Sequence, residues 1–114
     1  MSGFKLTVRQ GSRVERGSFE DLDAAMAALE EHAKAIRKEG PLEPRRMLRD
    51  FEPGDQVAGR VEISTGGFLR RGVDAGVDVM GDGRFVAFRG GVSRSPLEAG
   101  DGPFAAVRRA LVKA

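Results

Sequence analysis

The chain holds few of the residues that usually carry out chemistry. Its 114 residues include one histidine, His32, and no cysteine. A catalytic histidine needs a nucleophile or an orienting acid beside it, and the sequence offers no such partner for His32. We therefore interpret His32 as a residue at the edge of a helix, with its polar side in water. The lack of cysteine excludes disulfides, thiol catalysis and Cys-based zinc sites.

Three aspartates recur at four-residue steps, and they could be taken for a calcium loop: Asp74, Asp78 and Asp82. An EF-hand places oxygen ligands two residues apart and a glutamate at position twelve. Counted from Asp78, those positions hold Met80 and Arg89. Asp82 followed by Gly83 is instead typical of a tight turn. We therefore expect no metal site here.

Glycine-rich segments and serines also fail to form a known catalytic or nucleotide-binding motif. The pairs Gly66-Gly67 and Gly90-Gly91 lie in neither a Walker-type loop nor a dinucleotide-binding fingerprint. No serine stands in the strand-turn-helix elbow of hydrolases. The sequence thus predicts no cofactor, no catalytic residues and no enzyme activity.

Arginine is the most prominent residue type that could contact a ligand. It accounts for 15 of the 19 basic residues, although the net charge is only +2. Three clusters stand out: Arg45, Arg46 and Arg49; Arg70 and Arg71; Arg108 and Arg109. Two interpretations stay open. A GC-rich genome supplies arginine codons freely, whereas guanidinium groups on one face would bind phosphates. The chain has no Trp or Tyr, so platforms for base stacking are not evident.

A second candidate surface lies in a glycine-rich segment expected to be a loop, between residues 65 and 76. It carries Phe68 and Leu69, followed by Arg70 and Arg71. Exposed apolar side chains flanked by cations are suited to binding a protein partner. The alternative is that the loop folds back and buries them.

Hydrophobic periodicity predicts the strands and helices that carry these residues. Alternation predicts a strand over 4–9, which turns at 10–12 into a second short strand over 13–16. Apolar residues at three- and four-residue steps predict a helix over 22–36, with Ser18 and Asp21 resembling a capping box. Residues 41–56 carry three prolines and are predicted to be a connector.

The second half of the chain repeats this alternation of strands and a helix. We expect a strand over 57–63 and a hairpin of 77–79 with 85–88, closed by Asp82 and Gly83. Residues 91–98 can add an edge strand, because Pro96 is tolerated only at an edge. A closing helix begins near Pro103. The length suits one domain over residues 1–114. The fold class is α+β: an antiparallel sheet of about four to six strands with two helices packed on one face.

Two stretches resemble known sequences. The run of residues 76–83 with the helix end at 106–111, and the opening 4–11 with Phe19, Leu22 and Asp23 beyond it, are similar to small uncharacterised proteins of high-GC Gram-positive bacteria. That resemblance implies a cytoplasmic single-domain protein and no particular activity.

The leading expectation for function is a non-enzymatic module for protein interaction, as a homodimer or with another protein. A sheet with both helices on one face leaves its other face to be covered. The alternative is an arginine-rich module that binds RNA or DNA. No apolar run reaches the roughly 18–20 residues of a membrane span, and the chain does not start with a signal-peptide core. We therefore expect no membrane association and a cytoplasmic location.

Overall fold

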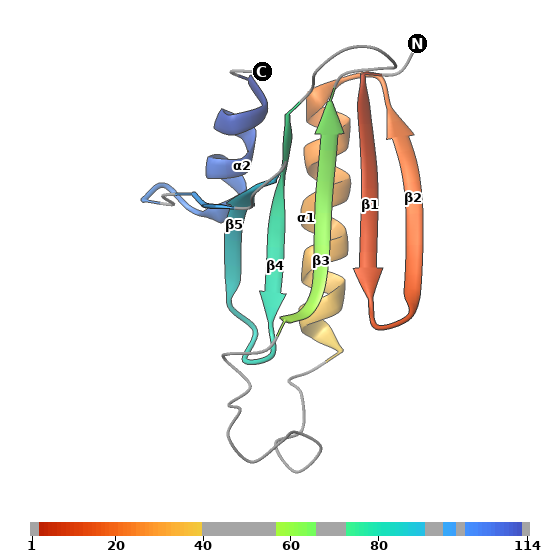
Figure 1. The fold of residues 1–114 in the computed structure, drawn as a ribbon, viewed down its shortest axis with the longest axis vertical. Coiled ribbons are helices and arrows are strands. Elements are labelled where there is room, and N and C mark those ends of the chain that lie inside the picture. The colour runs from red at the N-terminus through yellow and green to blue at the C-terminus, as the bar shows by residue number, and fades with distance from the viewer. Residues whose placement is uncertain (1–2, 40–56, 66–72, 91–94, 98–99, 113–114) are drawn as a thin grey trace.

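The computed structural model describes residues 3–39, 57–65, 73–90, 95–97 and 100–112. The strands are β1 (Phe4–Gln10), β2 (Arg13–Phe19), β3 (Val57–Thr65), β4 (Asp74–Met80), β5 (Phe85–Arg89) and β6 (Ser95–Pro96), and the helices are α1 (Leu22–Lys38) and α2 (Pro103–Val112). Figure 1 shows this arrangement. The predicted α+β class is confirmed.

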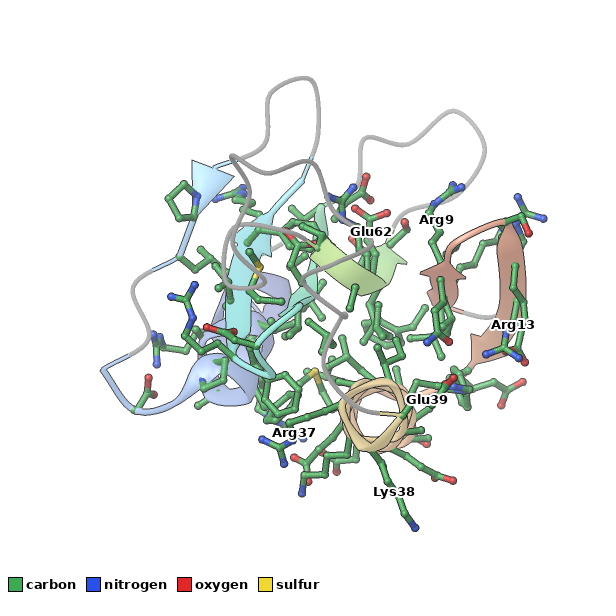
Figure 2. All side chains as sticks on the ribbon, turned by 90° about the horizontal axis from the view of Figure 1, so that it is seen from below. Arg9, Arg13, Arg37, Lys38, Glu39 and Glu62 are labelled. Carbon is green, nitrogen blue, oxygen red and sulfur yellow. The ribbon has the colours of Figure 1, made fainter. Side chains whose placement is uncertain are left out.

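The strands form one antiparallel sheet in the order β2-β1-β3-β4-β5-β6. Both helices pack on one face of it, as expected: α1 covers β1 and β3, and α2 covers β4 and β5. We call the opposite side the far face of the sheet. Seen along the strands, Arg9 and Glu62 point to the far face, whereas Arg37 and Lys38 lie on the side of α1 (Figure 2).

The first hairpin is longer than predicted. β2 pairs with β1 without interruption from Arg13 to Phe19, because Phe19 packs against the hydrophobic core at the end of the strand. Ser18 is therefore a strand residue, and the predicted capping box is wrong. Asp21 caps α1 instead, since its Oδ1 accepts a hydrogen bond of 2.7 Å from the Ala24 N–H.

The predicted apolar stripe of α1 is buried against the sheet. Its buried residues are Ala25, Met26, Leu29, Ala33 and Ile36. Gly59 of β3 lies directly under this stripe, and a Cβ there would come within 2.8 Å of the Ile36 side chain. The missing side chain at Gly59 thus lets the helix end approach the sheet closely.

The predicted loop at 65–76 is wrong at its end, because β4 begins at Asp74. Gly76 belongs to the strand for a steric reason. A Cβ at Gly76 would overlap the Val61 carbonyl oxygen and lie 2.7 Å from the Glu62 Cα. The glycine therefore marks a close backbone approach within the sheet, not a loop.

The second hairpin forms where Asp82 and Gly83 predicted it. Gly83 has φ of +94°, and the Asp82 Oδ1 accepts a hydrogen bond of 3.1 Å from the Arg84 N–H. The expected edge strand is confirmed as the two-residue β6, which places Pro96 at the sheet edge. The proline-containing connector at 41–56 lies outside the described residues.

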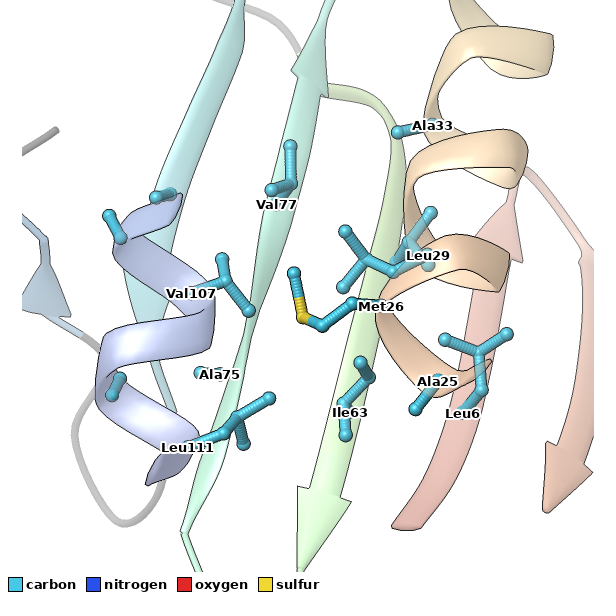
Figure 3. Packing of buried hydrophobic residues seen from close by; sticks show 14 of the residues in the cluster. Leu6, Ala25, Met26, Leu29, Ala33, Ile63, Ala75, Val77, Val107 and Leu111 are labelled. Atoms are coloured by element: carbon cyan, nitrogen blue, oxygen red, sulfur yellow. The ribbon is translucent and has the colours of Figure 1, made fainter. Parts of the chain in front are cut away.

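The core fills the space between the two helices and the sheet (Figure 3). Val61, Ile63 and Val77 from the central strands are fully buried, and Leu29 and Val107 reach them from the helices. α2 begins at Pro103 as predicted, after Gly102 with φ of +104°. One continuous core thus joins every long element of the described fold.

Candidate functional site

A charged pair stands at the centre of the far face. Arg60 on β3 and Asp78 on β4 are directly opposed in the register, and Arg60 Nε donates to Asp78 Oδ1 over 2.7 Å. The Asp78 side chain is 7% exposed, whereas that of Arg60 is 32% exposed. A carboxylate so little exposed needs a charged or hydrogen-bonding partner. We therefore interpret Asp78 as a structural residue that is stabilised by its ion pair with Arg60.

Phe88 extends this cluster on β5. It is 2% exposed, and the Arg60 guanidinium carbon lies 5.3 Å from its ring centroid. Its ring also lies over Gly76, where a Cβ would come within 3.1 Å of the ring. The cation–π contact with Arg60 and the packing on Gly76 together hold the ring against the sheet. Phe88 and Ala87 point to opposite faces of the sheet, because Ala87 belongs to the core under the helices.

Among the described residues of the far face, Glu62 has a clearly shifted pKa. Partial burial, and then the neighbouring Asp74 carboxylate, raise its pKa above the usual value, while Arg60 and Arg9 oppose the rise. A carboxyl group with a raised pKa is a common component of acid–base sites. On β3 it lies opposite Thr7 on one side and Gly76 on the other. The register thus places no second carboxylate directly opposite Glu62, and the hydroxyl group opposite it is that of Thr7.

A hollow of about 770 Å³ lies at the β4–β5 turn, beside the start of α2 and the end of α1. Arg37 stands over Phe85, with its guanidinium carbon 4.4 Å from the ring centroid. Phe85 in turn packs on Phe104, with 5.1 Å between ring centroids. The carboxylate of Asp82 bonds to Arg84, and hydrogen bonding, chiefly from the Arg84 backbone N–H, lowers the pKa of Asp82. The charged side chains that line the hollow thus already contact neighbouring groups of the protein: Arg37 contacts Phe85, and Arg84 bonds to Asp82.

Of the three arginine clusters, the structure describes Arg108 and Arg109, and both are bonded to carboxylates. Arg108 donates to Asp23 of α1 over 2.6 Å, and Arg109 bonds to the Asp101 carboxylate just before its own helix. The two neighbours therefore point in different directions and do not form one basic patch. The other proposed contact residues lie outside the described residues: Arg45, Arg46, Arg49, Phe68, Leu69, Arg70 and Arg71.

The remaining candidates for chemistry are dispersed. His32 is half-buried on α1, on the helix side of the sheet. Asp82 occupies the β4–β5 turn, whereas Asp74 and Asp78 lie on β4. Within the described ranges, no three His, Asp or Glu side chains gather closely enough to hold a metal ion.

One set of basic residues on the far face was not predicted from the sequence. Lys5 and Arg9 of β1, and Arg16 of β2, all project to the far face, as the pairing of Thr7 with Arg16 and with Glu62 indicates. The signal was present in the period-two alternation of both strands. Adjacent arginines stand out in a sequence, whereas cations two residues apart on two strands form a group only once the strands pair.

No family model matches this chain, and no curated protein or solved structure does so either. Of the helices in the described residues, neither has the length and apolar character needed to span a membrane.

Proposed function

We propose that this protein is a small non-enzymatic interaction module that pairs with a second copy of itself along the outer edge of β2. The contrast between the two edges of the sheet carries this proposal. β6 has two residues and ends in Pro96. A very short strand and a proline are both common ways of preventing a sheet edge from pairing with another strand. β2 has seven residues with no proline and an unbroken register. Such an edge is suited to strand addition.

Charge complementarity favours one register of this pairing over the two registers next to it. With a twofold axis at Val14, Arg13 of each copy lies opposite Glu15 of the other, and the two Val14 side chains meet. An axis at Glu15 or at Arg16 would instead oppose like charges, which destabilises cross-strand pairs. Val14 is 40% exposed, so its burial would add to the stability of the dimer.

The hydrogen-bonding pattern of an edge strand agrees with the same register. Gln10 and Arg13 flank the two-residue turn of the first hairpin, and such a pair exchanges hydrogen bonds with each other. Hydrogen-bonded pairs alternate along the ladder, so Val14 directs its N–H and C=O outward. Two Val14 residues on a twofold axis would then bond to each other.

A binding role, as opposed to catalysis, is supported by the pairing of Asp78, the most buried carboxylate of the described residues, with Arg60. We also infer a cytoplasmic location, because a domain without cysteine relies on packing alone for its stability.

Sedimentation equilibrium at up to about 100 µM tests the dimer, since an interface of one strand per copy is small. We expect a dimer for the parent protein and monomers for Glu15→Arg and for Arg13→Glu. The double exchange Arg13→Glu with Glu15→Arg restores opposite charges and should restore the dimer. Glu31→Arg, an exposed charge reversal on α1, is the matched control and should stay dimeric. A parent protein that is monomeric throughout this range contradicts the proposal.

A further inference from the structure

Three basic side chains follow one another along the far face over β1 and β2. Lys5 lies opposite Ser18, Thr7 lies opposite Arg16, and Arg9 lies opposite Val14. These pairs form three successive rows, and rows on one face of a strand are about 6.7 Å apart. Lys5, Arg16 and Arg9 therefore place one cation in each row, over about 13 Å along the strands. We call these three residues the basic track.

The basic track is not neutralised by β1 or β2. The far-face positions of these two strands hold Lys5, Thr7, Arg9, Val14, Arg16 and Ser18, and none of these is acidic. Among the described residues, no carboxylate lies within ion-pair distance of the three cations. The acid on the neighbouring strand is Glu62, whose raised pKa reflects burial more than pairing with Arg9. The track thus keeps its positive charge available to a ligand.

A hollow of about 420 Å³ lies within the basic track. It is lined by Lys5, Leu6, Thr7, Arg16, Gly17, Ser18 and Ser64, and the Leu6 side chain belongs to the hydrophobic core under the helices. An ammonium, a guanidinium and three hydroxyl groups all donate hydrogen bonds, and phosphate oxygens are strong acceptors. The lining therefore matches a phosphate group better than an apolar ligand or a cation.

The length of the track distinguishes between phosphate ligands. A single phosphoryl group in the hollow can contact Lys5 and Arg16, whereas Arg9 does not line the hollow. A chain of regularly spaced phosphates can contact all three cations. We propose that the far face over β1 and β2 binds the phosphodiester backbone of nucleic acid, with one phosphate held between Lys5 and Arg16.

The same face indicates how selective this binding is. Its positions on β1 and β2 hold no aromatic side chain, so base stacking does not contribute. Contacts to the backbone alone carry little sequence information. We therefore expect binding to be electrostatic and largely independent of base sequence. This site goes beyond the proposed dimer, since it uses the face of β2 and not its edge.

Fluorescence anisotropy with a labelled oligonucleotide of about 20 nucleotides tests this site between about 50 and 200 mM salt. Three contacts predict a slope of log K against log salt of about −2 to −3. Lys5→Gln and Arg16→Gln should each weaken binding about three- to tenfold at low salt, and each should reduce the slope by about 1. Lys38→Gln removes a cation on the α1 side of the sheet and is the matched control. It should bind like the parent protein.

Three results would overturn the proposal. The first is an oligonucleotide affinity that Lys5→Gln and Arg16→Gln leave unchanged. The second is an equal loss in Lys38→Gln, which would indicate a net-charge effect only. The third is binding of inorganic phosphate, or of vesicles containing anionic lipid, without oligonucleotide binding. All three variants concern exposed residues, and their melting temperatures report whether the fold is intact. Glu15→Arg, the monomer variant of the dimer test, should retain oligonucleotide binding, so the two proposals can fail separately.

Discussion

Arg60 and Asp78 are opposed across β3 and β4, with 2.7 Å between Nε and Oδ1. A second pair, Arg108 and Asp23, has a similar separation of 2.6 Å, but its aspartate side chain is 85% exposed compared with 7% for Asp78. The two pairs have the same chemistry and differ chiefly in burial. They therefore allow a direct measurement of what burial adds to an ion pair.

We expect Asp78→Asn to lower the free energy of unfolding by about 2 kcal/mol, because Arg60 then loses its charged acceptor in a partly buried place. Asp23→Asn should cost less than about 1 kcal/mol, because water screens the exposed pair. Urea unfolding at neutral pH measures both. Equal losses in the two variants would mean that burial adds nothing to the Arg60–Asp78 pair.

Gly76 should tolerate no side chain. In Gly76→Ala the new methyl group would press on the backbone of β3 and on the Phe88 ring, so we expect a loss of about 3 kcal/mol or failure to fold. Gly3→Ala is the control, since nothing lies within 4 Å of a Cβ there. Thermal unfolding followed by circular dichroism distinguishes them. A Gly76→Ala protein as stable as Gly3→Ala would contradict the close approach of β3 and β4.

Val107 and Val112 of α2 differ in how much of the residue is exposed to solvent. Val107 is fully buried, whereas Val112 is 64% exposed. We expect Val107→Ala to cost about 2 kcal/mol, from lost burial and the cavity left behind. Val112→Ala should change stability by less than about 0.5 kcal/mol. Denaturant unfolding of both variants checks this, and a similar cost for the two would show that α2 does not pack through Val107.

Glu62 should make stability depend on pH. Its pKa in the folded protein is raised above the usual 4.5, so the folded state holds the proton more tightly than the unfolded chain does. Ionisation of Glu62 therefore favours unfolding, and its contribution to stability falls as pH rises from 4.5 through the folded-state pKa. Glu62→Gln removes this effect, so its stability relative to the parent should increase over that range and then level off.

Urea unfolding at several pH values between about 4 and 7 measures the difference between Glu62→Gln and the parent. Glu31→Gln makes the same exchange on the exposed face of α1 and serves as the control. A difference between Glu62→Gln and the parent that stays constant, or that shrinks with rising pH, would contradict the raised pKa.

Most of the described elements could be predicted from the sequence, because their signals are local. Alternation at Phe4, Leu6 and Val8 identified β1, and the apolar stripe from Leu22 to Ile36 identified α1. The errors occurred where distant contacts override local preference. Gly76 resembles a loop residue in isolation, yet it lies in a strand because β3 and Phe88 leave no room for a side chain. Ser18 resembles a helix cap, yet pairing with β1 holds it in β2.

The sequence by itself determined the α+β class, both hairpins, both helices and which side chains of each strand share a face. These properties follow from the periods of strands and helices, which involve residues only a few positions apart. Only the tertiary structure decided that β1 lies between β2 and β3, that Arg60 meets Asp78, and that Lys5, Arg16 and Arg9 form one track on the far face. Strand order and register depend on how separate strands share one core, and no local pattern specifies that.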